Sequence, residues 1–436
     1  MAFSGDSKQF NLVDQTNLFK INYYKKSENM YNSDNVLQGR IKKRYDFIGK
    51  ERFVSTPLSF SGGVGAGVLP KSNAGNYQGA VIQSKRVYAT CEIERESIYA
   101  SKGDKGAFVQ ATKETVQKTV ESYMRNGSRI LFGDGSGILG RGDAATNVTG
   151  EGSEGNPYIV TISDASWLDA NFEEKDYVQV VTGLAAAPAN SGGAAEGLDS
   201  VANLLEIIDV DLANKQISLC GTSAVLAAHA GVAPGAGVTP MAATEGLAMQ
   251  RSYNKEPQGL KGIRDASALG GSLYNITVQR RWKSVVKDAN QEGITADLIN
   301  GLMLDVDKQC GKSPTMLMVG YEQYQNILAL MEDQKVYNLP NKNLKGHMGF
   351  EGLEWVGADG KRIGIFIDRF AKPDTLYAIN DSRVECHHRP GFGWFDDDGT
   401  VFLRLLDDDA YGARYGGYYQ NYIVPTGHGF LENLAV

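Results

Sequence analysis

Two short runs of aspartates have the residue type and spacing that could bind a divalent cation. The runs Asp396–Asp398 and Asp407–Asp409 present clustered carboxylate oxygens, which are the ligands that Ca²⁺ and Mg²⁺ prefer. The first run does not fit an EF-hand loop, because Trp394 stands where the first ligand would have to be if Gly399 were the turn glycine. We interpret the aspartates as turn and surface carboxylates, with a structural cation as the alternative, and predict no metal site and no cofactor.

Histidine and cysteine side chains are the other candidate metal ligands. His387 and His388 are adjacent, so on a strand their imidazoles point to opposite faces and cannot share an ion without a bend. We expect them to be solvent-exposed or packing histidines. The four cysteines are widely separated and form no CxxC pair, which fits a reducing compartment and excludes a cysteine-built zinc site. They are Cys91, Cys220, Cys310 and Cys386.

The glycine cluster 62–67 (GGVGAG) could cradle a phosphate if it followed a strand and opened a helix. Pro70, Asn73 and Gly75 follow it instead, so we do not interpret it as a dinucleotide-binding loop. The sequence also contains no GxSxG, HExxH or Walker-type GxxxxGK[ST] motif. We therefore predict that the protein is not an enzyme.

Composition limits the class of protein. A chain of 436 residues with 42% hydrophobic and 22% charged residues can bury a large core and is long enough for two or three domains. Its net charge of −7 argues against a protein that coats nucleic acid electrostatically. The start of the sequence has no signal-peptide pattern. The uncharged run 224–243 contains two prolines and several glycines, so we interpret it as a flexible loop and predict no membrane contact.

The segment 107–126 has the strongest helical pattern in the chain. Its apolar stripe repeats every four residues, at Phe108, Thr112, Val116, Val120 and Met124. The pattern predicts a helix of roughly 28 Å that ends at the Asn-Gly pair 126–127. A short apolar strand or turn is expected at 130–132, followed by the loop GDGSG at 133–137.

The residues before the long helix have the pattern of β-structure interrupted by glycine. Alternation is clearest from Val87 to Ile98, where Val87, Ala89, Cys91 and Ile93 would share one face. We interpret 51–106 as a long two-stranded ribbon. Residues 1–50 show no sustained periodicity but are rich in basic residues after Lys20, which indicates a solvated tail.

After the GDGSG loop, segments 158–183 and 204–220 predict strands of a small β-barrel or sandwich, with a hairpin near residue 213. Further on, the patterns predict helices at 282–290, 294–310 and 321–333 and buried strands at 313–320 and 363–367. The last block alternates strands with turns. Asp398-Gly399 is predicted to be a hairpin turn, and the tyrosines at 415, 418, 419 and 422 fall on one strand.

The long helix, the apolar triplet, GDGSG and the order of the later segments resemble the HK97-type major capsid proteins of tailed bacteriophages. The resemblance covers most of the chain apart from about 141–258. It implies an α+β fold with the following parts: an N-terminal arm (1–50), an extended loop or E-loop (51–106), the spine helix with part of the peripheral domain (107–140), an inserted β-rich domain (141–258), an axial domain (259–374) and the C-terminal part of the peripheral domain (375–436).

The resemblance implies a structural subunit of a virion that assembles in the host cytoplasm. Pentamers and hexamers of the chain would close into an icosahedral shell around packaged double-stranded DNA without sequence-specific binding. Portal and scaffolding proteins are implied partners, and a decoration protein is a further one. The arm and the extended loop would reach neighbouring subunits, and a basic arm would suit an acidic patch elsewhere in the shell.

Candidate contacts between subunits are basic side chains of the arm and loop and tyrosines of the C-terminal strand. They are Arg40, Lys42, Lys43, Arg44, Arg52, Lys71, Lys85, Arg86, Tyr418 and Tyr422. Some relatives cross-link the extended loop through a lysine, but nothing in the sequence marks Lys71, Lys85 or Lys102 as activated, and we predict no cross-link.

Two other functions remain open from the sequence. An encapsulin-like shell storing a cargo enzyme would share the fold, although a long inserted barrel favours a phage capsid. A β-rich tail or surface protein that binds glycans would have short strands throughout, and the helices predicted at 107–126 and 294–310 argue against it.

Overall fold

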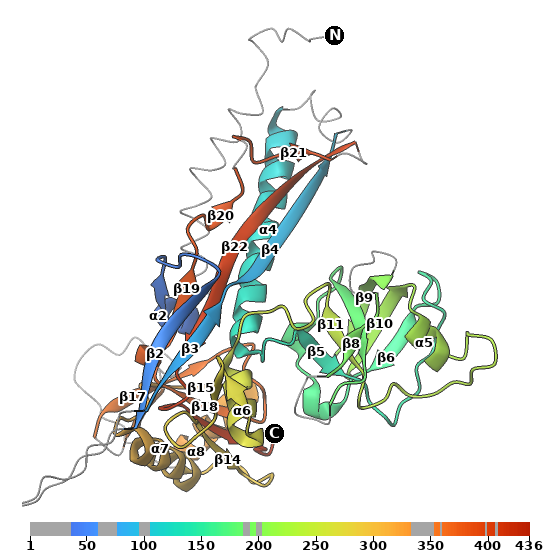
Figure 1. Ribbon diagram of the computed structural model, residues 1–436. Helices are drawn as coiled ribbons and strands as arrows, with labels where there is room; N and C mark the ends of the chain where they lie inside the picture. Colours follow the sequence, from blue (N-terminus) through green and yellow to red (C-terminus); the bar gives the residue numbers. More distant parts are fainter. Residues whose placement is uncertain are drawn as a thin grey trace, which may run out of the picture. The chain divides into compact units, whose positions relative to one another are not determined.

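The computed structural model describes residues 36–59, 76–95, 105–185, 192–197, 203–332, 353–357, 360–396, 399–405 and 409–436 (Figure 1). The fold is α+β. The chain divides into two compact units. The described residues of Met1–Glu51, Gln83–Ser128 and Glu385–Gln420 belong to unit 1, and those of Arg52–Ile82, Arg129–Val384 and Asn421–Val436 belong to unit 2.

Unit 1 is built on a sheet and most of a long helix. The sheet has the order β1-β19-β22-β20, with β4 and β21 also paired to β22. The elements are α2 (Val36–Arg40), β1 (Lys42–Arg44), β4 (Lys85–Glu94), α4 (Lys105–Phe132), β19 (Val384–His388), β20 (Gly393–Trp394), β21 (Leu403–Arg404) and β22 (Ala410–Ile423). Helix α4 packs on this sheet, because Tyr123 contacts Tyr415 and Phe392 at ring-centroid distances of 5.1 and 5.8 Å.

Helix α4 confirms the predicted spine helix but extends beyond the predicted end. Val116, Val120 and Met124 of the stripe are buried, while the side chains of residues 105–114 lie outside the described set. The helix passes through the Asn-Gly pair 126–127 and includes Ile130–Phe132, which we predicted to be a strand or turn. All three apolar side chains at 130–132 are buried. Burying them is worth roughly 1.5–3 kcal/mol each, which outweighs a helix penalty of about 1 kcal/mol for glycine.

The ribbon prediction is right about the existence of a ribbon and wrong about its strands. The two-stranded sheet consists of β2 (Glu51–Ser59) and β3 (Asn76–Gln83), and the glycine cluster that separates them lies outside the described residues. Strand β4 has the predicted alternation, with Cys91 buried and Tyr88 exposed. It pairs antiparallel with β22 from Lys85↔Tyr419 to Glu94↔Ala410 and so belongs to the unit 1 sheet.

The body of unit 2 is a mixed six-stranded sheet with helices against it. The strand order is β14-β23-β18-β15-β17-β16. The bounds are β14 (Val285–Asp288), β15 (Met316–Val319), β16 (Leu353–Val356), β17 (Arg362–Ile367), β18 (Leu376–Ile379), β23 (Gly429–Glu432), α6 (Leu260–Leu269), α7 (Ala296–Cys310), α8 (Tyr321–Glu332), the 3₁₀ turn η5 (Asp381–Arg383) and the hairpin strands β12 (Ser272–Leu273) and β13 (Ile276–Thr277).

Most predicted elements of this body are confirmed. Helix α7 begins after Thr295, whose hydroxyl accepts a hydrogen bond from the backbone N–H of Leu298, and ends at Gly311 in a left-handed conformation (φ 68°). Strand β15 is fully buried, as its apolar run predicts. The helix predicted at 282–290 is wrong, because Val285–Asp288 pairs in parallel with β23 and forms an edge strand.

The hairpin predicted at Asp398-Gly399 lies partly outside the described residues, and the Gly399 N–H donates to the Asp396 carbonyl at 2.8 Å, as in a turn. Strands β20 and β21 flank this turn, and both pair with β22 and not with each other. Gly399 is in a left-handed conformation (φ 80°), but Asp398 lies outside the described residues. The length of β22 explains this pairing, because one long strand can bind two short segments in succession along its edge.

The inserted segment forms a closed β-barrel. Its strands are β5 (Ile138–Arg141), β6 (Tyr158–Thr161), β7 (Tyr177–Thr182), β8 (Ala194–Ala195), β9 (Leu205–Asp211), β10 (Gln216–Gly221) and β11 (Gly246–Met249), with 3₁₀ turns η2 (Asp164–Ser166) and η3 (Asp169–Asn171). The order is β5-β11-β7-β9-β10-β6, with β8 added to β7. An antiparallel bridge between Gly142 and Ile162 brings β5 back to β6 and closes the barrel. The predicted hairpin near residue 213 is confirmed as β9–β10.

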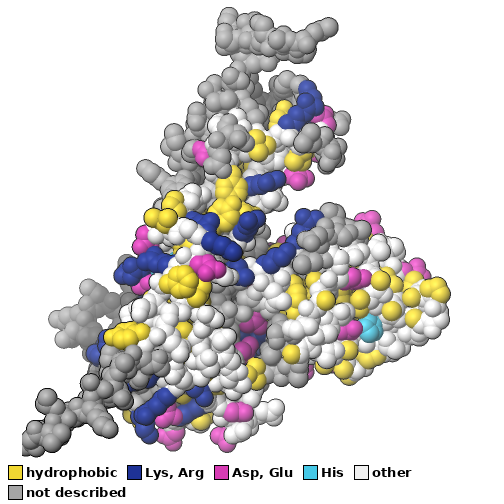
Figure 2. All heavy atoms as spheres, viewed as in Figure 1, with side chains coloured by type: hydrophobic (Ala, Val, Ile, Leu, Met, Phe, Trp, Pro, Cys, Tyr) yellow, Lys and Arg dark blue, Asp and Glu magenta, His cyan; other side chains and the backbone are white. Residues whose placement is uncertain are grey.

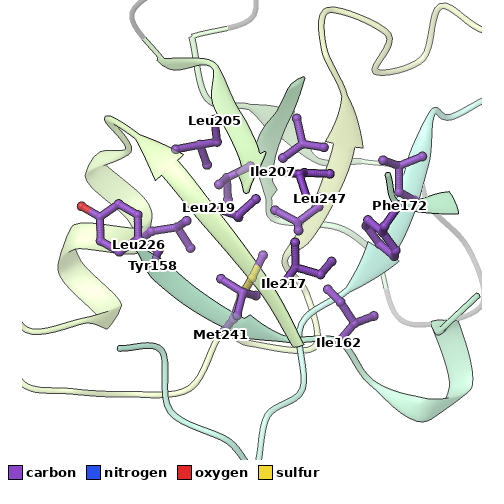
Figure 3. Close-up of a cluster of buried hydrophobic side chains, with 14 of the residues drawn as sticks. Tyr158, Ile162, Phe172, Leu205, Ile207, Ile217, Leu219, Leu226, Met241 and Leu247 are labelled. Carbon is purple, nitrogen blue, oxygen red and sulfur yellow. The ribbon is translucent and has the colours of Figure 1, made fainter. Parts of the chain in front are cut away.

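A large apolar cluster fills the interior of the barrel. Figure 3 shows side chains from several strands pointing toward one another, among them Ile207, Ile217 and Leu247, all fully buried. Part of the run predicted to be a flexible loop contributes to this cluster. It forms helix α5 (Ala224–His229), which is capped by Ser223 and buries Leu226. The loop prediction was wrong there because one buried leucine and a serine cap stabilise a turn of helix in an alanine-rich segment.

Candidate assembly surfaces

Neither a metal centre nor a membrane-spanning helix occurs in the described part of the chain. There, no three His, Cys, Asp or Glu side chains come together in a way that could hold an ion. No described helix combines the length and the apolar character needed to cross a bilayer. Of the aspartate runs, Asp397, Asp398, Asp407 and Asp408 lie outside the described residues. The remaining candidates are surfaces that could contact another protein.

The two adjacent histidines are packing residues, one of the two alternatives we expected. Both are buried in unit 1. The His388 ring stacks on Tyr45 at 5.2 Å and lies 5.2 Å from the Tyr419 ring and 5.3 Å from the Phe392 ring. Burial away from water lowers the pKa of His388 to about 4, so its imidazole is neutral at neutral pH.

The basic residues at the end of the predicted arm lie against their own subunit. Strand β1 pairs in parallel with β19, which places Arg44 opposite His387. The Arg44 guanidinium donates two hydrogen bonds to the Glu385 carboxylate, at 2.6 and 2.8 Å. Burial alone would raise the pKa of Glu385, but these bonds and the positive charge lower it. Arg40 and Lys42 are exposed, and Lys43 is half-buried.

A cation–π contact fixes the next residues of this segment. The Arg389 guanidinium lies 5.4 Å from the centre of the Phe47 ring and 5.8 Å from that of Tyr418, and it donates a hydrogen bond to the Gly49 carbonyl. Tyr418 is half-buried and so retains surface that a partner could contact. Residues 42–49 are therefore held by unit 1.

The remaining candidate residues are dispersed. Arg52 and Lys85 are half-buried, and burial lowers the pKa of Lys85. Arg86 is exposed on β4, whereas Lys71 lies outside the described residues. Tyr422 belongs to unit 2, where its buried ring lies 5.4 Å from that of Tyr274. The structure thus does not gather the ten candidates into one site, and their role in contacts between subunits stays a prediction.

The β2–β3 ribbon carries two exposed aromatic side chains that the candidate list omitted, although the list included Arg52 of β2. Phe53 is 69% exposed and Tyr77 is 59% exposed, although two-stranded sheets need a covered face for stability. Within the described residues, the base of the ribbon contacts its own subunit, because Ala80 and Ile82 are fully buried and the Val81 N–H donates to the Tyr274 carbonyl at 2.9 Å. The sequence signal that could have identified this surface was one aromatic residue in each strand of the ribbon, Phe53 in β2 and Tyr77 in β3.

A buried ionic junction holds the base of the barrel. Lys261 on α6 donates to the Asp134 carboxylate of the GDGSG loop at 2.6 Å, and the Ser136 N–H donates to the same carboxylate at 2.9 Å. Burial opposes ionisation, but Lys261 and Ser136 together lower the pKa of Asp134 to about 2. Arg129 at the end of α4 also pairs with the buried carboxylate of Glu256, with one contact at 3.2 Å.

This junction continues to the last strand. Arg264 on α6 bonds Asp265 and lies 2.9 Å from the Glu432 carboxylate on β23. Burial raises the pKa of both carboxyl groups, although Arg264 opposes the shift. The two segments that enclose the inserted barrel are thereby fixed to the unit 2 body. The sequence could not predict this junction, because Lys261 and Asp134 lie 127 positions apart. Its only signal was the presence of polar residues in the segments GDGSG and QGLKGIRD.

One family model matches the chain, over residues 227–388, and its description is the SU10 major capsid protein. The segment extends from α5 through the unit 2 body to β19. No curated protein matches the sequence. Among solved structures, the Cyanophage A-1(L) capsid asymmetric unit is similar with a TM-score of 0.46 and 10% identity, and the similarity covers 92% of this chain and 93% of that chain.

Two further structures show the range of similarity. A chain of Mycobacterium phage Patience has a TM-score of 0.38 and 9% identity over 99% of this chain and 91% of that one. The SrpI encapsulin complex from Synechococcus elongatus has a TM-score of 0.24 and 12% identity, and covers 40% of this chain and 61% of that one. All three TM-scores lie below 0.5, so the family match is the comparison that bears on identity. That match runs from α5 to β19, over less than half of the chain, and is a similarity to a phage major capsid protein.

Proposed function

We propose that the protein is the structural subunit of an icosahedral bacteriophage shell, in which copies of the chain form pentamers and hexamers around packaged double-stranded DNA. The family match supports the class of protein, and the exposed β2–β3 ribbon is the observation that carries the mechanism. The role is structural and not enzymatic.

The ribbon supports self-assembly because it is incomplete within one subunit. Two aromatic side chains, Phe53 and Tyr77, stand exposed on a pair of strands that no third strand joins among the described residues. Aromatic residues are enriched where proteins meet, since they bury large areas with few rotatable bonds. We expect the ribbon to lie over a neighbouring subunit. Repeated around a closed lattice, such modest contacts add up to a stable shell.

The partners follow from this role. A portal protein, a separate scaffolding protein and a decoration protein are proposed partners of the shell, which would form in the host cytoplasm and remain in the virion. The DNA is enclosed without sequence-specific contacts.

Electron microscopy of the purified protein tests the proposal. Closed shells of regular size are expected from the wild-type chain, either alone or with the scaffolding protein of the same phage. A Phe53→Ser, Tyr77→Ser variant should remain folded and form few shells. Shells that contain a protein cargo and no nucleic acid in infected cells would support an encapsulin-like store instead, and trimeric fibres would contradict a shell altogether.

A further inference from the structure

Charge is distributed very unevenly between the inserted segment and the rest of the chain. Residues 141–258 contain 15 acidic and 5 basic residues, a net charge of −10. The remaining residues contain 36 acidic and 39 basic residues, a net charge of +3. Two copies of the barrel therefore repel each other, and each copy attracts a positively charged surface.

A positively charged surface of this kind lies on the unit 2 body. We call it the basic patch, and its side chains are Arg280, Arg281, Lys283, Lys308, Lys312 and Arg383. The two groups of residues meet at the end of α7, because the Gln309 side chain donates to the carbonyls of Arg280 and Lys283 at 3.4 and 2.8 Å. Arg383 is connected to the same loop through Thr426. The Thr426 hydroxyl donates to the Arg281 carbonyl at 2.5 Å, and the Thr426 carbonyl accepts from Arg383 at 2.7 Å.

The backbone that carries the basic patch is held in place, and its basic side chains form no ion pair within the described residues. Trp282 is fully buried between the exposed Arg281 and Lys283, so the loop backbone cannot move freely. Within the described residues, no carboxylate forms an ion pair with any of the six basic side chains, although Lys287 nearby pairs with Asp305 at 2.6 Å. A backbone that is already held in place loses little conformational entropy on binding.

Five of the barrel's acidic side chains lie around one turn, at Lys175. We call this surface the acidic face, and its residues are Glu154, Glu173, Glu174, Asp176 and Glu206. The turn lies against β9, because the Lys175 N–H donates to the Ile207 carbonyl at 2.8 Å and the Ile207 N–H donates to the Asp176 carbonyl at 2.9 Å. Lys175, 3.1 Å from Glu206, is the basic residue among them. The barrel surface in Figure 2 carries acidic and apolar side chains and few basic ones.

We propose that the basic patch of one subunit binds the acidic face of the barrel of a second copy. The inference rests on the self-assembly proposed above and names the surfaces that meet. The two surfaces lie on different parts of the chain, so the contact is head-to-tail, the kind that continues from copy to copy into a ring or lattice. Complementary charge also steers encounters and suppresses the like-charged barrel–barrel approach.

Packaged DNA is the other anion that the basic patch could attract, because phosphates bind exposed arginine and lysine. Complementarity favours the second copy. One contact accounts both for six basic side chains without carboxylate partners among the described residues and for a net charge of −10 confined to the insertion. DNA binding would explain the first feature and leave the second without a role.

Charge reversal with compensation tests the proposal on the full-length chain. The variants are Arg280→Glu with Lys283→Glu, Glu173→Lys with Glu174→Lys, and all four substitutions together. Arg369→Glu, an exposed arginine elsewhere in unit 2, is the matched control. Light scattering follows assembly at low and high salt, circular dichroism confirms folding, and fluorescence anisotropy measures binding of a double-stranded oligonucleotide.

Each double reversal should slow assembly at low salt by about tenfold, and high salt should remove most of the difference. The fourfold variant should recover to within about twofold of wild type, and the control should match wild type. A fourfold variant as slow as the doubles, or doubles that assemble normally, would overturn the inference. So would loss of oligonucleotide binding in the basic-patch variant with normal assembly. A wild-type chain that stays monomeric at every concentration contradicts the proposed function as well.

Discussion

In the inserted barrel, every strand of the main path has a neighbour on both sides, and β5 returns to β6 through the bridge between Gly142 and Ile162. In the β2–β3 ribbon, each described strand has one partner, and side chains such as Phe53 and Tyr77 stand exposed. Both regions are β-structure that lies in the sequence between other elements, the ribbon between β1 and β4 and the barrel between α4 and α6. The strands of the barrel's main path pair on both edges and enclose a core, whereas each described ribbon strand pairs on one edge and carries an exposed aromatic side chain.

The difference shows which part of the chain depends on neighbours. A closed sheet with a filled core gains its stability within one molecule, so changes inside it should affect folding and spare assembly. An open ribbon gains stability only when another surface covers it. Changes at its exposed residues should therefore affect assembly and spare folding. Four predictions test this contrast.

The largest effect is expected at the junction that ties the barrel to α4. Glu256→Gln removes the charge that compensates the buried Arg129 guanidinium, and we expect the free energy of unfolding of unit 2 to fall by about 3–5 kcal/mol. Urea denaturation measures the change. Asp164→Asn breaks the exposed pair with Lys215 and should cost at most about 1 kcal/mol. Equal losses of unfolding free energy in the two variants would show that the buried junction stabilises unit 2 no more than an exposed ion pair does.

The next effect concerns the barrel core. Ile207→Ala leaves a cavity in the filled barrel and should destabilise it by about 2–5 kcal/mol. If the barrel is autonomous, hydrogen exchange should accelerate in β6 to β11 and stay unchanged in α7 and β15. Leu212→Ala, at a side chain that is 61% exposed, should change stability by less than about 0.5 kcal/mol. Loss of protection that spreads to α7 would argue against an independent barrel.

The third effect is a loss of stability at low pH that arises at His388, outside the barrel. Burial lowers the pKa of His388 to about 4, below the value of 6.5 for an unfolded histidine. Between these two pH values the folded state binds fewer protons at His388 than the unfolded state does. The contribution of His388 to the free energy of unfolding is therefore complete above pH 6.5 and is lost as pH falls toward 4. The loss amounts to about 3 kcal/mol. His388→Phe keeps an aromatic ring in place and should flatten this part of the pH profile.

Two comparisons isolate that effect. Burial raises the pKa of Asp368 to about 6, and this shift changes stability with pH in the opposite direction. The contribution of Asp368 to the free energy of unfolding is complete below pH 3.8 and is lost as pH rises through 6. The difference between wild type and His388→Phe cancels this term. The barrel's one histidine, His229, lies 2.8 Å from Glu245 near the surface, and His229→Gln should leave the profile of the rest of the chain unchanged.

The smallest change in stability is expected at the ribbon. Phe53→Ser with Tyr77→Ser should alter the free energy of unfolding of the isolated subunit by less than about 0.5 kcal/mol, since both rings are mostly exposed. The same variant should assemble poorly in light-scattering experiments. Ile82→Ser, in the same ribbon but fully buried, should instead destabilise the subunit itself. Normal assembly of the Phe53, Tyr77 variant would remove the ribbon from the mechanism.

Local patterns in the sequence were enough to predict elements whose signals are local. Thr295 and Gly311 mark both ends of α7, and the turn near residue 213 marks the β9–β10 hairpin. The sequence could not show that α4 continues past Gly127, because tertiary burial of Ile130–Phe132 decides its end. The short run Val285–Asp288 is equally compatible with a helix or a strand until β23, from the end of the chain, pairs with it.

Contacts between distant residues were out of reach in the same way. The partner of β4 lies more than 300 positions away in β22, and the Arg44–Glu385 pair depends on the register between β1 and β19. The candidate list selected charged residues by composition, so it included Arg44, which bonds its own subunit, and omitted Phe53 and Tyr77. Exposure of an aromatic side chain is a property of the folded ribbon.

The inserted barrel begins and ends at neighbouring positions. Strand β5 pairs with β11, the Met249 N–H donates to the Gly137 carbonyl at 3.1 Å, and the Asn254 N–H donates to the Ser136 carbonyl at 2.8 Å. A chain segment whose ends lie side by side can be exchanged for another without stretching the host fold. This position in the subunit is consequently a natural point for acquiring, losing or grafting a whole domain, including one chosen to display a foreign protein on each copy.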